Sequence, residues 1–531
     1  MQSTTEHTYD LIIIGAGING AGIARDAAMR GLSVLLLDKA DIGSGTSSVS
    51  TRLIHGGLRY LEHGEVGLVR ESLRERETLL HVAPHLVRPL PLIVPIYEKQ
   101  QRGRLTIRAG MMAYDALSVH KSLPRHRMLT ADETLTEAPG LNSSGLLGAA
   151  LYYDAQVAFA ERLVLENVLS AVEQGASIQT YSQVDAFTIE KGEACGIQYR
   201  NLMTGEQQNV RASVVINAAG PWVDEIIGIA NQNSERLIGG TKGSHIIVAP
   251  FAGAPRTAVY IEAHADQRPL FIIPWNQLYL IGTTDTRFEG DLNAVQIGES
   301  ERHYLLEEVN RYFPEARLTA SSIKYCYSGV RPLAFTDDRS ESAITRRHFV
   351  REHPNIRGLI SIVGGKLTTY RQLAQETVDL IMHKLGRRAA RVDTAKIPLP
   401  GARCDSFEDF SREFLGQAGL PSTVSKRLLR IYGTRATDVV KLLKRDQSFT
   451  EVIDNESGAL AAEVVFSFEN ELAKTLSDCL MRRTMVGLNS SCGTNAVEAA
   501  AMIGRRFLGW SEDRAKSEVR AYRELIRSRK T

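Results

Sequence analysis

Cysteine is scarce in this sequence of 531 residues, and the few cysteines present are far apart. None of them forms a C-x-x-C pair: Cys195, Cys326, Cys404, Cys479 and Cys492. This spacing argues against a disulfide framework, a zinc site and an iron–sulfur cluster, and it favours a reducing cytoplasm. We therefore expect no metal site, and any redox chemistry would require an organic cofactor that passes electrons directly to a diffusible acceptor.

Long apolar runs and an excess of one charge are also absent. No stretch approaches the roughly 18 to 20 apolar residues needed to span a bilayer, and the N-terminus lacks a signal pattern. The 63 basic and 61 acidic residues leave a net charge of +2, which gives no general support for nucleic-acid binding. The length predicts two or three domains. We expect a cytoplasmic protein without a spanning helix.

What the sequence does contain is a βαβ pattern over residues 9–40. An apolar strand at 9–14 leads into Gly15-Ala16-Gly17-Ile18-Asn19-Gly20, which matches G-x-G-x-x-G. The three glycines permit a tight turn, close approach of a pyrophosphate, and close packing of helix on strand. A second strand at 33–37 ends at Asp38, where an acid binds ribose hydroxyls. The pattern predicts a dinucleotide site without separating FAD from NAD.

Further along the chain, the pattern changes twice. Apolar runs at 214–217 and 358–363 end in tight turns, and we expect both to join the first sheet. Residues 236–285 contain short strand-like runs that predict an antiparallel sheet. After Pro398–Gly401 the spacing becomes helical, and the expected helices cover 425–432, 438–443 and 459–480.

Other motifs complete a family resemblance. They are Thr46-Ser47-Ser48, His55-Gly56-Gly57-Leu58-Arg59-Tyr60-Leu61-Glu62, Lys242-Gly243-Ser244-His245, Ile281–Asp285, Tyr327–Leu333, Gly364–Arg371 and Leu480–Thr484. With the glycine-rich turn, these segments resemble the aerobic, FAD-linked glycerol-3-phosphate dehydrogenases, which belong to the D-amino-acid oxidase-like flavoproteins. The resemblance covers essentially the whole chain, in the expected order.

This resemblance implies an α/β fold with three parts. A Rossmann-like FAD-binding domain built from discontinuous segments is expected at 8–80, 150–232 and 326–388. An antiparallel β-sheet substrate domain is expected at 81–149 and 233–325, and an α-helical C-terminal domain at 389–531. The implied reaction oxidises sn-glycerol 3-phosphate to dihydroxyacetone phosphate, by hydride transfer from C2 to the flavin.

The resemblance also implies the site residues. The substrate-binding side chains are Arg59, Tyr60, His245, Arg331 and Lys366. The catalytic ones are His245, as the first choice of base, His55 as the second, Arg331 and Lys366. The Gly364-Gly365-Lys366 turn is expected to open a helix whose N–H groups face the flavin. The cofactor-binding residues are Gly15, Gly17, Asn19, Gly20, Asp38, Thr46, Ser47, Ser48, Gly220, Gly364, Gly365, Lys366, Leu367 and Thr368.

The implied electron acceptor is a membrane quinone. Residues 99–127 carry seven basic residues against one acid, and residues 514–530 carry seven against two. Such segments predict peripheral binding at the cytoplasmic face of the inner membrane, although a solubilising face or an oligomer contact, such as a homodimer's, would have the same composition. The open alternatives are a glycerophosphate oxidase that reduces oxygen, an NAD-dependent dehydrogenase, and a flavin-binding protein without activity.

Overall fold

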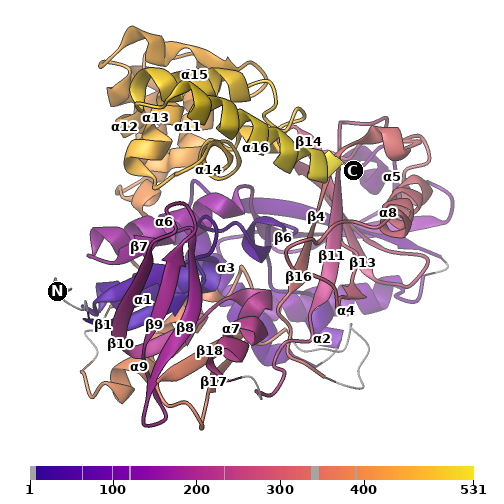
Figure 1. The fold of residues 1–531 in the computed structure, drawn as a ribbon. Coiled ribbons are helices and arrows are strands. Elements are labelled where there is room, and N and C mark those ends of the chain that lie inside the picture. The colour runs from indigo at the N-terminus through magenta and orange to yellow at the C-terminus, as the bar shows by residue number, and fades with distance from the viewer. Residues whose placement is uncertain are drawn as a thin grey trace, which may run out of the picture.

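The computed structural model describes residues 8–62, 64–98, 100–118, 121–231, 234–336, 346–388 and 392–530. Two sheet regions lie side by side, and the C-terminal helices cover one end of both (Figure 1). Among the described residues, no helix is both long enough and apolar enough to span a bilayer. The predicted α/β fold class, with a helical C-terminal region, is confirmed.

The first sheet draws its strands from distant parts of the chain. They are β1 (Thr8–Ile14), β2 (Val34–Leu37), β7 (Ser177–Gln179), β8 (Ser182–Glu190), β9 (Glu193–Asn201), β10 (Gln207–Asn217), β17 (Phe349–Glu352) and β18 (Leu359–Val363). The order is β17-β18-β10-β1-β2-β7, and the hairpin β8–β9 pairs with β10. From β18 to β7 the neighbours are parallel, so the discontinuous segments form one parallel core.

Burial on both faces explains the continuous apolar runs of these strands. Leu11 and Ile13 pack with α1 (Ile18–Met29), α6 (Ala160–Glu173) and α9 (Tyr370–Lys384). The alternate residues, Ile12 and Ile14, pack on the other face with residues of β8, β9 and α7 (Val223–Ala230). The turn between β1 and α1 is therefore held on both sides at the carboxyl edge of the sheet.

The second sheet contains the predicted strands of the 236–285 region and others from the first third of the chain. Its strands are β3 (Leu53–Ile54), β4 (Val87–Tyr97), β5 (Arg127–Leu129), β6 (Leu146–Val157), β11 (Thr241–Val248), β12 (Ala258–Glu262), β13 (Pro269–Trp275), β14 (Leu278–Gly282), β15 (Thr286–Arg287) and β16 (Ile323–Arg331). The order is β15-β11-β14-β13-β12-β4-β6-β3; β16 pairs with β11, and β5 with β6.

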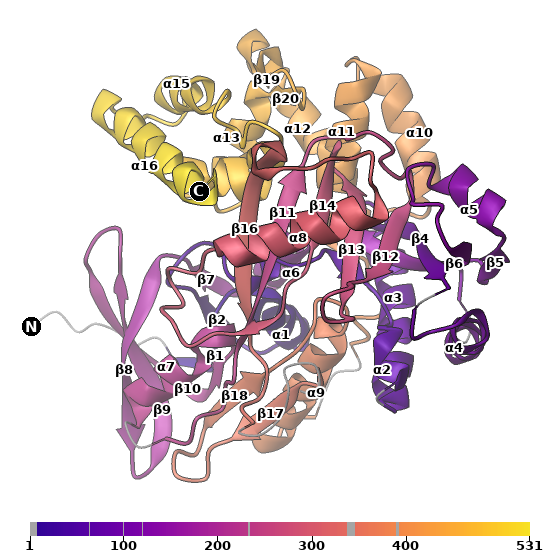
Figure 2. The ribbon, with the colours of Figure 1, turned by 90° about the vertical axis from the view of Figure 1, so that its right-hand side faces the viewer.

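This second sheet is antiparallel apart from the β12–β4 pair. β6 and β16 each extend across a predicted domain limit, at 149/150 and 325/326, because strand pairing rather than chain position decides which sheet a segment joins. The helices of this half include α8, which lies across the sheet in Figure 2. They are α2 (Arg59–Glu62), α3 (Val66–Val82), α4 (Arg104–Leu117), α5 (Ala131–Glu137) and α8 (Glu299–Tyr312).

The C-terminal part consists of helices and one short strand pair. Its elements are α10 (Phe407–Gln417), α11 (Ser422–Tyr432), α12 (Ala436–Leu442), β19 (Val452–Asp454), β20 (Ala459–Leu460), α13 (Ala461–Asn470), α14 (Leu476–Asp478), the π-helical η8 (Cys479–Arg483), α15 (Val497–Phe507) and α16 (Glu512–Lys530). The predicted single helix over 459–480 is wrong. Leu472 has a φ of +60°, which ends α13, and Thr475 caps a new helix.

Candidate active site

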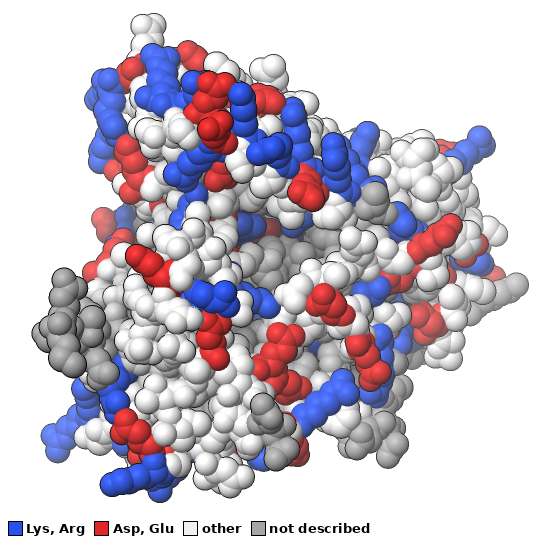
Figure 3. Space-filling view, viewed as in Figure 1, with Lys and Arg blue, Asp and Glu red and all other residues white. Residues whose placement is uncertain are grey.

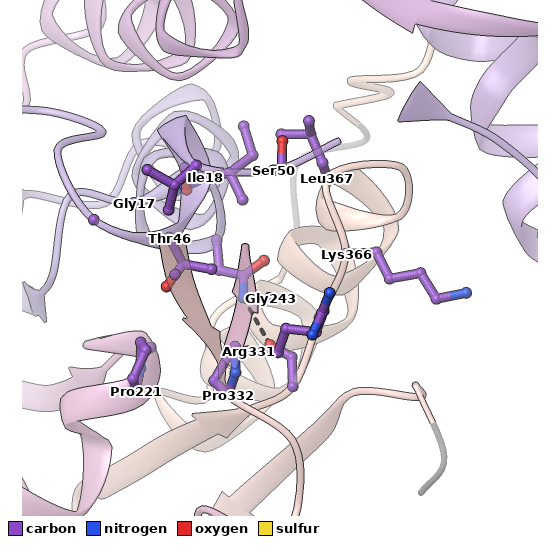
Figure 4. A pocket seen from close by; sticks show the side chains of 18 of the residues that line it. Gly17, Ile18, Thr46, Ser50, Pro221, Gly243, Arg331, Pro332, Lys366 and Leu367 are labelled. Carbon is purple, nitrogen blue, oxygen red and sulfur yellow. Dashed lines mark hydrogen bonds between the residues drawn. The ribbon is translucent and has the colours of Figure 1, made fainter. Parts of the chain in front are cut away.

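A cavity of about 1380 Å³ extends from the β1–α1 turn to the strand ends of the second sheet. Figure 4 shows Gly17, Ile18 and Thr46 at one side of it, and Arg331 and Lys366 at the other. Arg59, Tyr60, His55 and His245 line the same cavity. The fold thus places the expected cationic side chains and the glycine-rich turn in one space. Of the expected site residues, Gly20 and Ser48 do not line it.

The glycine-rich turn has the geometry that its three glycines require. Gly15 has a φ of +107°, and a Cβ there would lie 2.6 Å from the Ala218 carbonyl oxygen. A Cβ on Gly20 would lie 1.9 Å from the Gly15 oxygen, so Gly20 lets α1 pack against β1 and acts behind the cavity. Gly17 borders the open space at the start of α1, where the positive end of the helix dipole favours an anion.

Asp38 closes this turn from the end of β2. Its carboxylate accepts hydrogen bonds from the Ala16 N–H at 2.7 Å and the Ala40 N–H at 2.8 Å. Burial raises the pKa of Asp38 despite these two bonds. Each carboxylate oxygen has a further lone pair, and Asp38 lines the cavity, so it can accept a ribose hydroxyl there as well.

The hydroxyls of residues 46–48 point in different directions. The Thr46 hydroxyl donates to the Val330 carbonyl at 2.8 Å, and the Ser47 hydroxyl accepts from the Ile18 N–H at 3.0 Å. These contacts hold the loop against β16 and α1. The Ser48 hydroxyl donates instead to the Gly45 carbonyl at 3.0 Å. Ser48 therefore stabilises its own turn, while Thr46 and Ser47 line the cavity.

The chain after β18 is a loop and does not start a helix. Gly364 and Gly365 have φ of +78° and +91°, which a right-handed helix does not allow. The expected helix at 364 is therefore wrong, and α9 begins at Tyr370. The loop still reaches the site: Gly364 to Thr368 line the cavity, and the Thr368 hydroxyl accepts from the His55 N–H at 3.2 Å.

The cavity wall contains buried polar atoms that require a ligand. Asn19 Oδ1, Trp222 Nε1 and His245 Nδ1 have no hydrogen-bond partner within the part of the chain that the structure describes. Leaving such atoms unpaired costs about 1 to 3 kcal/mol each. All three residues line the cavity, so a polar dinucleotide cofactor fits the donors and acceptors present. In the described ranges, no three His, Cys, Asp or Glu side chains form a metal site.

Lys366 and Tyr60 meet at the cationic end. The Lys366 ammonium nitrogen lies 4.0 Å from the centre of the Tyr60 ring. Burial lowers the pKa of Lys366 to about 7, with Glu71 and Glu65 acting in the opposite sense. Burial likewise raises the pKa of Tyr60 and lowers that of Arg331 to about 10. The charge of Lys366 thus changes near neutral pH.

The two histidines are neutral at that pH. Burial, assisted by Arg331 and Arg52, lowers the pKa of His245 to about 3, and its Nε2 lies 3.0 Å from the Thr51 hydroxyl. Burial lowers the pKa of His55 to about 4. Both rings can exchange hydrogen bonds with a substrate hydroxyl. As proton acceptors they are weaker than a base whose pKa matches the working pH.

Sequence reasoning gave no role to two charged residues of this wall. Asp285 ends the Ile281–Asp285 motif, and its carboxylate pairs with Arg331 at 2.9 Å and Arg346 at 3.2 Å. The motif was the available signal for Asp285. Arg346 lies in no motif, and only the fold brings it to the cavity.

Comparison with known proteins agrees with this arrangement. Residues 10–371 match the family model described as FAD dependent oxidoreductase, and residues 392–515 match the C-terminal domain of alpha-glycerophosphate oxidase. The chain is 45% identical to a glycerol-3-phosphate dehydrogenase of Synechocystis sp., across 98% of this chain and 96% of that protein. It is 34% identical to an aerobic glycerol-3-phosphate dehydrogenase of Staphylococcus haemolyticus, across 90% and 86%.

A solved structure gives the same result for the fold. The glycerol-3-phosphate dehydrogenase from Bacillus halodurans, complexed with FAD, superposes with a TM-score of 0.81 at 28% identity. The match covers 100% of this chain and 96% of that one. The chain therefore belongs to the glycerol-3-phosphate dehydrogenase family of FAD-dependent oxidoreductases.

Proposed function

We propose that the protein uses FAD to oxidise sn-glycerol 3-phosphate to dihydroxyacetone phosphate and passes the electrons to a membrane quinone. One observation carries the proposal. Arg59, Arg331 and Lys366, which are far apart in the sequence, line the same cavity as the glycine-rich turn. This cavity offers the Arg59 and Arg331 guanidinium groups for a phosphate and the Lys366 amine for a proton, beside a dinucleotide site, and the family membership agrees with the dinucleotide site.

Each part of the cavity has its own task. Gly17, Thr46 and Ser47 lie where the cofactor's pyrophosphate would bind, and bound FAD supplies the hydride acceptor. Arg59 and Arg331 bind the substrate phosphate, because guanidinium groups form paired, charge-assisted hydrogen bonds to phosphate oxygens. Such bonds contribute about 1.5 to 3 kcal/mol each, which is enough to separate glycerol 3-phosphate from glycerol.

Lys366 is the proton acceptor in this proposal. Oxidation at C2 requires the C2 hydroxyl to lose its proton, and a base whose pKa lies near the working pH is the most effective. Lys366, with a pKa of about 7, meets this condition better than His245 at about 3 or His55 at about 4. The neutral histidines orient the substrate hydroxyls by hydrogen bonding.

An anaerobic absorption spectrum tests the reaction. The purified holoenzyme should show an oxidised flavin band that sn-glycerol 3-phosphate bleaches, while glycerol and lactate leave it unchanged. Glycerol controls for the phosphate and lactate for a general 2-hydroxy acid activity. A colourless protein, or a flavin band that glycerol 3-phosphate leaves intact, would contradict the proposal.

A membrane quinone is the proposed acceptor, and α4 supports it. Leu105 and Met112 on this helix are 81% and 57% exposed, and Arg104 and Arg108 are exposed near them. An exposed apolar side chain flanked by cations suits the surface of an anionic membrane. Residues 99, 119 and 120 of this basic segment lie outside the described residues. The proposed location is the cytoplasmic face of the inner membrane.

The second basic segment has a different structure. α16 buries Ala515, Val519, Tyr522 and Ile526 against the C-terminal helices, so its apolar face is already covered. Its Lys and Arg side chains lie among acidic ones at the top of Figure 3. Residues 514–530 therefore fit a solvated face, and α4 is the membrane-binding element of the proposal.

Oxygen is the competing acceptor, because the C-terminal family model takes its description from alpha-glycerophosphate oxidase. Turnover in air distinguishes the two. A dehydrogenase should reduce a soluble quinone analogue with little peroxide, whereas one peroxide formed for each glycerol 3-phosphate oxidised would favour the oxidase.

A further inference from the structure

The substrate end of the cavity contains a carboxylate shared by several guanidinium groups. Asp285 follows β14, and its Oδ1 lies 2.9 Å from Arg331 Nη1 while its Oδ2 lies 3.2 Å from Arg346 Nη2. Arg268 Nη1 lies 3.7 Å from Oδ2 and also donates to the Asp285 carbonyl. Three separate segments of chain are thus joined through one side chain.

The negative charge of the Asp285 carboxylate disfavours phosphate binding nearby. The carboxylate lies beside Arg331, which we assign to phosphate, and a negative charge there opposes the binding of an anionic substrate. Among the described residues, Asp285 is the only acid within 4.0 Å of Arg331 or Arg346. A group that weakens the attraction for substrate requires another role in the site.

Geometry indicates that role. The side chains of Arg331, Arg346 and Asp285 are 24%, 19% and 12% exposed, so the cluster is mostly shielded from water and the two guanidinium groups repel each other. Arg331 is fixed further: its Nη2 donates to the Thr283 hydroxyl at 3.0 Å and to the Thr284 carbonyl at 3.2 Å. Asp285 accepts from Arg331 Nη1 and Arg346 Nη2, and Arg331 Nη1 also donates to the Thr241 hydroxyl at 3.4 Å. The protein thus holds both terminal nitrogens of Arg331, which fixes the plane of its guanidinium group, while Asp285 holds Arg346 through Nη2.

We propose that Asp285 is a positioning residue, which orients Arg331 and Arg346 toward the substrate phosphate at the expense of phosphate affinity. The inference rests on the proposed function, since it concerns the phosphate of glycerol 3-phosphate. Asp285 acts through the two arginines. Its benefit appears in the rate, because hydride transfer requires C2 to be held at a defined place and a displaced substrate reacts more slowly.

The experiment compares Asp285→Asn with Arg331→Met in the FAD-loaded enzyme. Asparagine keeps the size of the side chain and removes its charge. We expect Asp285→Asn to lower kcat by about ten-fold or more and to bind inorganic phosphate, the probe of the phosphate site, at least as tightly as the parent enzyme. Arg331→Met should weaken phosphate binding by about ten-fold or more, because a direct ligand is lost.

The values of kcat and of the affinity for inorganic phosphate distinguish a positioning role of Asp285 from other roles. An unchanged kcat in Asp285→Asn, or a loss of phosphate affinity parallel to the loss of kcat, would overturn the inference. If Asp285→Asn fails to retain FAD, Thr283→Val removes a neutral acceptor of Arg331 and should lower kcat with phosphate affinity kept. An unchanged kcat there would also overturn it. If the proposed function is wrong, the parent enzyme itself will not be reduced by glycerol 3-phosphate.

Discussion

At the scale of single residues, Lys366 provides the most direct test of mechanism. Burial brings its pKa to about 7, so its charge changes within the working range of pH. A proton acceptor must be neutral, whereas a phosphate ligand must be charged. The two roles of Lys366 therefore predict that kcat/KM changes with pH in opposite directions.

We expect kcat/KM for glycerol 3-phosphate to rise with pH through about 7, as Lys366 loses its proton. Lys366→Arg keeps the positive charge but cannot lose a proton in this range, so it should lower kcat by about 100-fold and remove this rise. Steady-state rates from pH 6 to 9 provide the measurement. The substrate phosphate titrates at about pH 6, and the arginine variant controls for that titration. A fall of kcat/KM above pH 7 would assign Lys366 to phosphate binding.

Gly365 provides a second test at this scale. Its φ is +91°, and an added Cβ would lie 2.6 Å from Asn19 Nδ2. Gly365→Ala should therefore displace Asn19, which borders the cofactor space, and weaken FAD binding by about ten-fold. The matched control is Gly386→Ala, where φ is +63° and no atom lies within 4 Å. Titration of each apoprotein with FAD measures the FAD affinity of the two variants. Equal affinities in the two variants would show that the Asn19 contact is unimportant.

Much of the cofactor site could be predicted from residues whose backbone or chemistry leaves a pattern. Gly15, Gly17 and Asp38 stand at a spacing fixed by one βαβ unit, so a dinucleotide site was predictable from these residues. The choice of FAD came from the family resemblance, and the family confirms it. The roles of His245 and Lys366 stay predictions. Their pKa values depend on burial among segments distant in sequence, and no local pattern carries that information. Arg346 was missed for the same reason.

At the scale of elements, η8 links the C-terminal helices to the cofactor loop. Arg482 Nε and Arg483 Nη2 lie 2.5 Å and 2.8 Å from the buried Asp41 carboxylate. Asp41 stands between Asp38 and the Thr46–Ser48 loop. π-helical turns are frequent at functional sites, and this one directs two consecutive arginines at one acid. The expected helix over 459–480 concealed this feature, because apolar spacing does not distinguish a continuous helix from two joined by a break.

Asp41→Asn should therefore loosen FAD as well as destabilise the fold. Removing one partner of a buried ion pair costs about 3 to 5 kcal/mol, and the loop that holds the cofactor would lose its anchor. The control is Asp438→Asn, whose partner Lys441 is exposed and which should change stability by less than about 1 kcal/mol. Thermal unfolding and FAD retention on dialysis measure the effect. Tight FAD binding in Asp41→Asn would contradict the link.

The pH dependence of this contact follows from its charge. Burial opposes ionisation of Asp41, but Arg483 and Arg482 hold its pKa below the usual range. A depressed carboxylate pKa stabilises the folded state above the pKa of the unfolded chain, and this stabilisation is lost as pH falls through the folded pKa. FAD retention should thus fall more steeply with decreasing pH in the parent enzyme than in Asp41→Asn.

At the scale of the whole molecule, the proposed membrane contact of α4 can be tested. Leu105→Glu together with Met112→Glu should weaken binding to anionic phospholipid vesicles, because the exposed apolar face of α4 is lost. Met502→Glu on α15 is the matched control, since Met502 is 68% exposed on a different surface. Vesicle sedimentation at low and high salt measures the effect. Equal loss in both variants would exclude α4 as the specific contact.

The discontinuous first sheet also has a consequence for biosynthesis. β1 and β2 leave the ribosome early. Two later strands complete the parallel core: β10, which pairs with β1, ends only at Asn217, and β18, which pairs with β10, ends only at Val363. Until then, a growing chain displays the unpaired edge of β1 or β10, a surface that promotes aggregation. Stalled nascent chains that end before residue 363 should therefore require a chaperone and should not acquire flavin. Chains stalled beyond α9 should begin to take up flavin.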